Sequence, residues 1–450
     1  MRLASALAAP ASPRRGWRTF VVLWATQSCS LVGTQVTFFA LNIWLAQGLY
    51  PDPAQKKALA LALSANGFAY ALPTVTGALL GGVAADRHDR RRIMQLANFA
   101  NAVVAFAIVA LLASGRMTLP LLLPLTALYA LCGAFHASSF DTSYAMLVPR
   151  ERLPRANGMM QSVWALSALL APGIAAGLVG VFGTHARAAG PGAPAALGRG
   201  AALAVVVDAA TFVIAGLVLT RLTLPRVERA PQTESARPGL AADLREGWAF
   251  VFAHRPLLML LGAFALANLV FASLGVFQPL LVKFRYATDA AAHGFSFEAA
   301  LAWLATVGAA GGVAGGVIVS AWGGLERRRV YGVLAPMAIS AAMLIGVGLA
   351  RALFVAAGAL AMAEGMIPFV NAHSLAIWQA RTPLALQGRV FAVRRLIAQF
   401  TFPLGTLLAG SLAASLDPGV ALAVLGVALA LGAGGLALHP AMRHIEPESA

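Results

Sequence analysis

The chain has 450 residues, of which 59% are hydrophobic and only 11% are charged, and its mean hydropathy is +0.77. A chain of this composition has too few polar residues to cover the surface of a soluble globular protein. Its apolar stretches are each about 20 residues or longer, the length that crosses a hydrocarbon core of about 30 Å as a helix, and they lack the alternating pattern of a membrane barrel. The net charge of +16 does not indicate nucleic-acid binding, because the arginines lie in short loops beside apolar spans, where they act as topology signals.

Clusters of charged residues, together with prolines and glycines between the apolar stretches, divide the chain into twelve predicted membrane-spanning helices. They are expected to begin near residues 18, 58, 93, 119, 157, 200, 256, 299, 329, 352, 389 and 419. Residues 183–200 are rich in Gly, Ala and Pro and are expected to form a flexible surface loop. The long polar stretch 221–255 separates six spans from six and is expected to be a linker. We therefore predict an all-α membrane protein with one six-helix bundle in residues 1–220 and a second in residues 256–450.

Lys and Arg are about three times more frequent at one set of loop ends than at the other. The richer set comprises both termini and the loops that follow every second span. By the positive-inside rule, both termini should lie in the cytoplasm. The two cysteines, Cys29 and Cys132, both fall inside apolar spans, so neither a disulfide framework nor a metal-binding cysteine cluster is indicated.

The two halves of the chain share a weak internal repeat. The pair Gly81-Gly82 recurs 234 residues later as Gly315-Gly316, and a run of three arginines follows each pair. A repeat of this kind is expected of a duplicated six-helix unit. Two-fold repeats around a binding site near the middle of the membrane are common in secondary transporters. We therefore expect the two bundles to be pseudo-symmetric.

The densest charge cluster lies between the second and third spans. A glycine is followed after three residues by an Asp-Arg pair and, two residues later, by two basic residues: Gly82, Asp86, Arg87, Arg90 and Arg91. This spacing resembles the loop motif of the major facilitator superfamily, although Asp89 stands where a second glycine is common. Within that superfamily, residues 147–158, 208–212 and 387–391 resemble the branch of enterobactin-type siderophore exporters and macrolide efflux proteins.

The resemblance implies a transporter with two rocking six-helix halves. It also implies that Asp86 contacts the eleventh helix across the interface on the cytoplasmic side and helps to hold the outward-open state, since a carboxylate can accept bonds from a helix N-terminus or an arginine. The alternative is that these charges only fix the topology and bind anionic lipid.

Three carboxyl groups inside predicted spans are candidates for proton coupling or for binding a cationic group, because an ionisable residue at membrane depth usually faces a cavity or a partner. Glu364 is the strongest, since Gly365 and Pro368 could open the tenth helix beside it. Asp208 in the sixth span and Asp141 in the fourth follow. The alternatives are a structural pair for Glu364 and pairing of Asp141 with nearby loop arginines.

The other polar residues in or beside the spans have one or two predicted roles each. Arg394 and Arg395, early in the eleventh span, either extend to the inner interface or reach a carboxylate such as Asp86 or Asp141. Asp417 is predicted to cap the twelfth helix. A further set could line a cavity or join helices: Gln27, Asn42, Asn66, His136, Gln161, Asn268, Gln278, Asn371 and His373.

Two features depart from proton-coupled relatives. Their fourth-helix arginine is absent, its position falling near Tyr129, and the Gly-Pro of the fifth-helix antiporter motif is replaced by Ala171-Pro172. No P-loop is present, so direct ATP drive is not indicated.

The sequence therefore predicts a monomeric secondary transporter of the bacterial inner membrane. It would export a small amphipathic molecule, such as a drug or siderophore, in exchange for protons, without a cofactor, a metal or a nucleic-acid partner. An importer of the same fold is the alternative, since fold does not set direction. A membrane-embedded enzyme acting on lipid is a remote alternative, because no nucleophile–base or metal grouping is visible.

Overall fold

The computed structural model describes residues 13–188, 193–223, 240–443 and 445. In this part of the chain, twelve spans are long and apolar enough to cross a membrane, so the predicted all-α class and the twelve spans are confirmed. The first bundle contains α1 (Pro13–Trp44), α2 (Lys56–Arg87), α3 (Arg90–Ala113), α4 (Leu119–Leu147), α5 (Leu153–Ala188) and α6 (Ala193–Arg221). The second contains α8 (Arg255–Phe284), α10 (Phe297–Trp322), α11 (Arg329–Leu349), α12 (Leu353–Gly365) with α13 (Ile367–Arg381), α14 (Gln387–Ser415) and α15 (Pro418–Leu438).

Equivalent helices pack in the same way in the two bundles. α2 packs on α4 and α3 on α6 in the first bundle, and α10 packs on α12 and α11 on α15 in the second. Gly81 lets α2 approach α4, since a Cβ there would lie 3.0 Å from the Cα of Phe135. Gly315 lets α10 approach α12, where a Cβ would overlap the backbone oxygen of Gly365. The repeated glycines therefore mark equivalent close helix contacts, and the two bundles are pseudo-symmetric.

The segment 183–200 differs from the prediction. α5 continues to Ala188 and α6 begins at Ala193, so the predicted flexible loop is wrong for most of this segment. The alanines that dominate it have the highest helix propensity of any residue, and they outweigh the scattered glycines and prolines.

A helix that the sequence did not predict lies in the stretch 221–255. It is α7 (Leu240–Ala253), and residues 224–239 lie outside the described part of the chain. α7 packs against the first turn of α14, where Arg389 Nη1 lies 2.6 Å from Glu246 Oε2. Gly247 makes this approach possible, because a Cβ there would lie 2.7 Å from the Arg389 backbone oxygen.

The tenth span is interrupted where the sequence places glycine and proline. α12 ends at Gly365, Met366 separates the two pieces, and Pro368 lies in the first turn of α13. Proline lacks the N–H that would continue the hydrogen-bond ladder of the preceding helix. The twelfth span begins as predicted, because Asp417 Oδ1 accepts hydrogen bonds from the backbone N–H groups of Gly419 (2.9 Å) and Val420 (3.1 Å).

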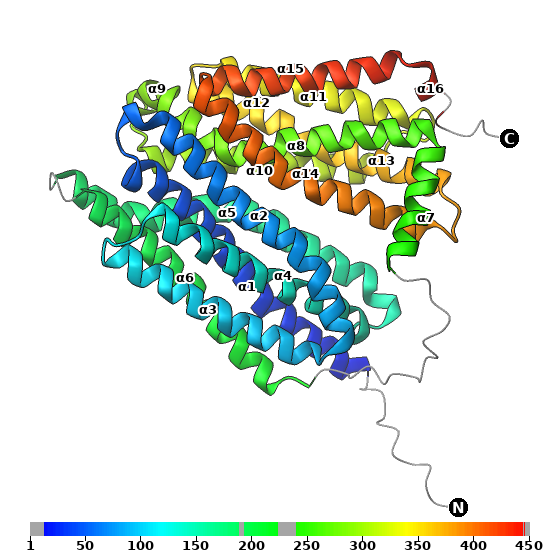
Figure 1. Ribbon diagram of the computed structural model, residues 1–450, viewed down its shortest axis with the longest axis horizontal. Coiled ribbons are helices and arrows are strands. Elements are labelled where there is room, and N and C mark those ends of the chain that lie inside the picture. The colour runs from blue at the N-terminus through cyan, green and yellow to red at the C-terminus, as the bar shows by residue number, and fades with distance from the viewer. Residues whose placement is uncertain (1–12, 189–192, 224–239, 444, 446–450) are drawn as a thin grey trace, which may run out of the picture.

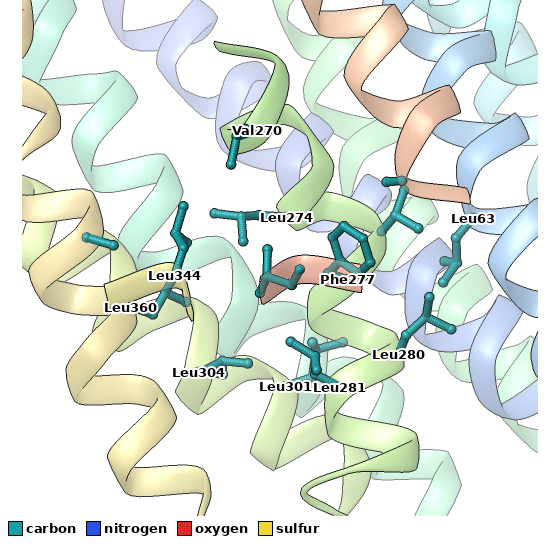
Figure 2. Close-up of a cluster of buried hydrophobic side chains, with 14 of the residues drawn as sticks. Leu63, Val270, Leu274, Phe277, Leu280, Leu281, Leu301, Leu304, Leu344 and Leu360 are labelled. Carbon is teal, nitrogen blue, oxygen red and sulfur yellow. The ribbon is translucent and has the colours of Figure 1, made fainter. Parts of the chain in front are cut away.

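The hydrophobic core of the second bundle is continuous with the first bundle near one end. Figure 2 shows Phe277 and Leu281 of α8 among buried leucines of α10, α11 and α12, with Leu63 of α2 lying beside Leu280. All of these side chains are at most 2% exposed. Because α2 belongs to the first bundle, this cluster helps to join the two halves.

The two halves meet mainly through α2 with α14 and α5 with α10. Ser64 Oγ donates to the Thr406 backbone oxygen at 2.7 Å, and Gly410 packs so closely on Ser64 that a Cβ would overlap its side chain. Figure 1 shows the bundles close together at the end that carries α9 (Ala287–Ala292) and diverging toward the end that carries α7, the start of α1 and α16 (Pro440–Arg443). We call the first the arginine-poor end and the second the arginine-rich end.

The three lysines of the chain, Lys56, Lys57 and Lys283, all lie at the arginine-poor end. Lys283 Nζ in α8 donates to the backbone oxygens of Ala46 (2.5 Å) and Tyr50, at the π-helical end of the first span. Lys56 Nζ in α2 donates at 3.1 Å to the backbone oxygen of Leu416, just after α14. Cations are favourable at helix C-termini, so each half supplies an ammonium group to a helix end of the other half.

The Lys283 contact should therefore help to hold the arginine-poor end closed. Replacing Lys283 with Met should shift the population toward a state closed at the arginine-rich end, by about tenfold or more, since hydrogen bonds to a charged group contribute about 1.5–3 kcal/mol. The measurement is electron–electron resonance between spin labels at exposed Arg92 and Leu384, after replacement of Cys29 and Cys132 by serine. The Lys283→Met protein should show a larger fraction of short distances.

The neighbouring residue provides the control for this experiment. Lys57 is exposed, and Lys57→Met removes the same charge from the same end. An unchanged distance distribution in Lys283→Met, or an equal shift in Lys57→Met, would show that the cross-bundle hydrogen bonds do not stabilise this state.

Candidate functional site

A carboxyl group is buried at the centre of the first bundle. Asp208 of α6 is 0% exposed. Its Oδ2 accepts hydrogen bonds from Tyr129 Oη of α4 at 2.5 Å and from Thr37 Oγ1 of α1 at 2.8 Å. Gly33 lets the backbone of α1 come close, because a Cβ there would lie 2.5 Å from Asp208 Oδ1. The carboxyl group therefore connects three helices of one bundle.

The surroundings of Asp208 provide donors but no cation. Oδ1 has no hydrogen-bond partner, and no basic side chain pairs with Asp208 in the part of the chain that the structure describes. An uncompensated charge at this depth is expensive. Protonation on Oδ1 removes that charge and leaves Oδ2 free to accept both existing bonds. Asp208 thus has the geometry of a carboxyl group that can exchange a proton.

Tyr129 stands where the sequence lacks the fourth-helix arginine of proton-coupled relatives. Its hydroxyl lies 2.8 Å from Thr34 Oγ1 as well as 2.5 Å from Asp208 Oδ2, and its ring packs edge-on against Phe212 at 5.6 Å between centroids. The missing arginine is evident from the sequence, whereas the donor role of the tyrosine is not. Thr34 and Thr37 were also missed, because hydroxyl groups in spans usually bond their own helix.

A cavity of about 260 Å³ adjoins this cluster and is lined by residues from all six helices of the first bundle. Tyr129 and Thr34 form part of its wall, so the cavity reaches the donor of Asp208. Of the polar residues that the sequence analysis grouped as cavity or helix-joining candidates, Gln27 and His136 line it. Asn98 and Asn101 line it too. Their spacing of three residues places them on one face of the third span, which is the signal in the sequence that could have identified them.

Several other polar candidates have structural roles instead. His373 Nδ1 lies 2.8 Å from the Phe369 backbone oxygen, and its Nε2 accepts a hydrogen bond from the Leu325 N–H at 2.8 Å. These bonds fasten the turn after α10 to α13. Asn66 Oδ1 accepts from Thr126 Oγ1 at 3.0 Å, which joins α2 to α4. Across the described residues, no group of three or more His, Cys, Asp or Glu side chains is arranged to hold a metal ion.

Glu364 lies in the last turn of α12, directly before the break in the tenth span. Its carboxyl group packs against α10 at Gly308, where a Cβ would lie 2.9 Å from Oε1. The structural pair considered from the sequence is not present among the described residues, in which no donor or cation contacts this carboxyl group. Glu364 belongs to the second bundle and Asp208 to the first, so the structure does not bring the two acids into one site.

Asp141 and Arg395 lie on opposite halves of the molecule and form no ion pair within the described residues. Asp141 of α4 is exposed and lines the cavity, and Arg395 of α14 lies within electrostatic range of its carboxylate. Arg394 has a different role from its neighbour. Its Nη2 donates to Ser374 Oγ at 3.3 Å, and its guanidinium lies 5.0 Å from the centroid of the Phe264 ring. Arg394 therefore packs inside its own bundle, which neither sequence interpretation anticipated.

Two arginines of the loop motif attach it to neighbouring helices of the first bundle. Arg90 Nη1 contacts Met146 Sδ of α4 at 2.8 Å. Arg91 donates from Nε to the Leu219 oxygen at 2.8 Å and from Nη2 to the Thr220 oxygen at 2.5 Å, at the end of α6. A guanidinium is favourable at this helix C-terminus. These two residues therefore have an evident structural role.

Asp89, which replaces a common glycine, caps α3. Its Oδ1 accepts hydrogen bonds from the backbone N–H groups of Arg91 at 3.0 Å and Arg92 at 3.4 Å, as a capping aspartate does. This departure from the family pattern therefore gives α3 a well-defined start.

The remaining motif residues lie on the outside of the first bundle. A Cβ at Gly82 would meet no atom within 4 Å, Arg87 is exposed, and the Asp86 side chain is 76% exposed, with Oδ1 at 3.8 Å from Arg90 Nη2. The α2 face at Gly82 is therefore open to the approach of another helix at the end where the halves diverge.

Two equivalent six-helix bundles that lie close together at one end and diverge at the other are the architecture of many secondary transporters. The chain belongs to the Major Facilitator Superfamily, whose family model matches residues 23–406.

Relatives agree with this family, and solved structures have a similar fold. The chain is 23% identical over 392 residues to macrolide efflux protein A of Streptococcus pyogenes, with 86% of this chain and 88% of the relative covered. It is also 23% identical to macrolide efflux protein A of Enterococcus faecalis, with 77% and 99% covered. A crystal structure of a nucleoside transporter has a similar fold, with a TM-score of 0.71 at 13% identity and coverage of 93% and 99%. A bacterial homologue of the lysosomal transporter Spinster, inward-facing and unoccupied, has a TM-score of 0.64 at 17% identity and coverage of 97% and 94%.

Proposed function

We propose that this transporter exports a small amphipathic molecule across the bacterial inner membrane in exchange for protons. The arginine-rich end faces the cytoplasm under the positive-inside rule, and both termini lie there. In this orientation the two halves diverge toward the cytoplasm and lie close together toward the outside. The relatives named as macrolide efflux proteins support export and a substrate of that amphipathic kind.

The observation that carries the proposal is the environment of Asp208: complete burial, two hydroxyl donors on Oδ2 and no paired cation among the described residues. When the halves open outward, a proton from outside neutralises the carboxyl group. When they open inward, the proton is released to the cytoplasm, and the charge that remains favours a different arrangement of Tyr129 and Thr37. Proton occupancy thus biases the equilibrium between the two states, which is the differential interaction that coupling requires.

Glu364 and the motif have supporting roles in this scheme. Glu364 is a second proton acceptor or a contact for a cationic substrate group, since its carboxyl group lies at the helix break and has no partner among the residues that the structure describes. Closure at the arginine-rich end would bring α14 toward Gly82 and Asp86 of α2, and Asp141 would approach Arg395. An importer of the same fold is the second candidate function, because fold does not set direction.

Replacement of Asp208 by asparagine should uncouple transport from protons. The amide oxygen can still accept the hydrogen bonds from Tyr129 and Thr37, but the side chain cannot titrate. In proteoliposomes, flux of a macrolide driven by an imposed pH gradient should fall at least tenfold, while exchange of substrate without a gradient should persist. Asp417→Asn is the matched control, because asparagine also caps a helix and gradient-driven flux should be unchanged.

Two results would contradict this role of Asp208. Gradient-driven flux at the wild-type rate in Asp208→Asn would exclude it as the coupling group. Loss of both gradient-driven flux and exchange, with normal insertion, would assign it to the transport cycle itself rather than to coupling. Accumulation of the macrolide on the cytoplasmic side would favour the importer.

Replacement of Glu364 by glutamine tests the second acid. The change removes a titratable group and no observed hydrogen bond, so the fold should be retained. We expect gradient-driven flux to fall severalfold, measured in the same proteoliposomes. Full retention of flux, and of its dependence on the pH gradient, would remove Glu364 from the coupling scheme.

A further inference from the structure

Asp208 is sealed from solvent, so any proton that it exchanges must pass through a neighbouring group. The residue is 0% exposed, it does not form part of the cavity wall, and its Oδ1 is buried without a hydrogen-bond partner among the described residues. A proton passes between groups that are within hydrogen-bond reach of one another, directly or through one water. The route to Asp208 must therefore begin at a group bonded to Oδ2.

Two hydroxyl groups are bonded to Oδ2, and only one of them leads outward. Thr37 is 4% exposed and does not line the cavity, and its hydroxyl has no bond other than the one to Oδ2 within the described part of the chain. Tyr129 Oη lies 2.5 Å from Oδ2 and 2.8 Å from Thr34 Oγ1. Thr34 is half-buried and lines the cavity. A continuous chain of hydroxyl groups therefore runs from the cavity through Thr34 and Tyr129 to the acid.

The packing of α1 against α6 fixes the geometry of this chain. Gly33 lets the α1 backbone approach the acid, because a Cβ there would lie 2.5 Å from Asp208 Oδ1. Thr34 and Thr37 are three residues apart and therefore share one face of α1. From that face Thr37 reaches the carboxyl group and Thr34 reaches the tyrosine. The two threonines thus have different roles at the same acid.

The cavity can supply the outer end of the chain. Its volume of about 260 Å³ has room for several water molecules, since each needs about 30 Å³. Its wall includes Asp141, which is exposed. The cavity therefore extends to the exterior of the first bundle, and water in it can exchange a proton with Thr34.

We propose that Thr34 and Tyr129 form a two-hydroxyl relay that carries protons between the cavity and Asp208, with Thr34 as the entry group. In uptake, a hydronium ion gives a proton to Thr34 Oγ1. Thr34 passes its own hydroxyl proton to Tyr129 Oη, and Tyr129 passes its own to Asp208 Oδ2. Each hydroxyl group ends with one proton, and the charge of the hydronium ion cancels that of the carboxylate.

The relay is reset by a half-turn of the carboxyl group. This rotation brings the protonated oxygen to the position of Oδ1, and the unprotonated oxygen can then accept hydrogen bonds from Tyr129 and Thr37 again. Release follows the same steps in reverse. The inference rests on the proposed coupling role of Asp208 and adds the path that its proton takes.

The test measures how fast the Asp208 carboxyl group takes up a proton in the purified full-length protein. A rapid drop in pH is followed by time-resolved infrared spectroscopy, and the band of protonated Asp208 is identified by its absence in Asp208→Asn. Thr34→Val keeps the shape of the side chain, removes the entry hydroxyl and leaves both bonds to Oδ2 in place. The rate of uptake should fall by about tenfold or more, and the final amplitude of the band should be unchanged.

Two variants are matched controls. Thr34→Ser keeps a hydroxyl group at the entry and should take up the proton at the wild-type rate, which a mere change of packing at Thr34 would not restore. Tyr70 also lines the cavity, but its hydroxyl makes no hydrogen bond to Asp208. Tyr70→Phe should therefore leave the rate unchanged.

The contrary outcomes separate the relay from the proposed function. An unchanged rate in Thr34→Val, or equal slowing in Tyr70→Phe, would overturn the relay and leave the coupling role of Asp208 standing, because the acid would still take up its proton. If wild type shows no Asp208 band at any pH across the neutral range, the coupling role fails and the relay fails with it. If Thr34→Val does not insert, Tyr129→Phe replaces it, and uptake at the wild-type rate in that variant would overturn the relay.

Discussion

The account depends on one hydrogen bond, from the Tyr129 hydroxyl to the buried carboxyl group of Asp208. A carboxyl group at membrane depth is expensive as a charged group. Here hydroxyl donors from α1 and α4 reduce that cost, and no cation pairs with the carboxyl group within the described part of the chain. The same tyrosine forms part of the wall of the adjoining cavity. A single side chain therefore connects the buried carboxyl group to the wall of the cavity.

The two ends of the molecule differ in what joins the halves. At the arginine-poor end, close glycine contacts and the lysine bonds to helix ends hold α2 against α14 and α8 against the first span. At the arginine-rich end, the α2 face at Gly82 is open, and Arg389 at the start of α14 is paired with Glu246 of α7. Closure at this end would bring α2 toward the same turn of α14 that α7 contacts.

The fold could be predicted well from the sequence, because span length and arginine placement are local features. The thickness of the bilayer sets the first, and the positive-inside rule governs the second. The repeated glycines are also visible in the sequence. It also predicted the Asp417 cap and the break near Gly365. The partners of the acids were not predictable in the same way. Tyr129 and Thr37 lie far from Asp208 in the chain and meet it only because α1, α4 and α6 pack together. The separate roles of Arg394 and Arg395 likewise depend on the rotation of α14, which hydropathy does not determine.

The central claim is that substrate binding and the proton on Asp208 are linked, and the most direct test is proton release on substrate binding. Linkage is reciprocal, so purified wild-type protein in weakly buffered solution with a pH indicator should release about one proton per bound macrolide. The Asp208→Asn protein should bind the macrolide and release none. Equal proton release by the two proteins, or none by wild type across neutral pH, would contradict the account.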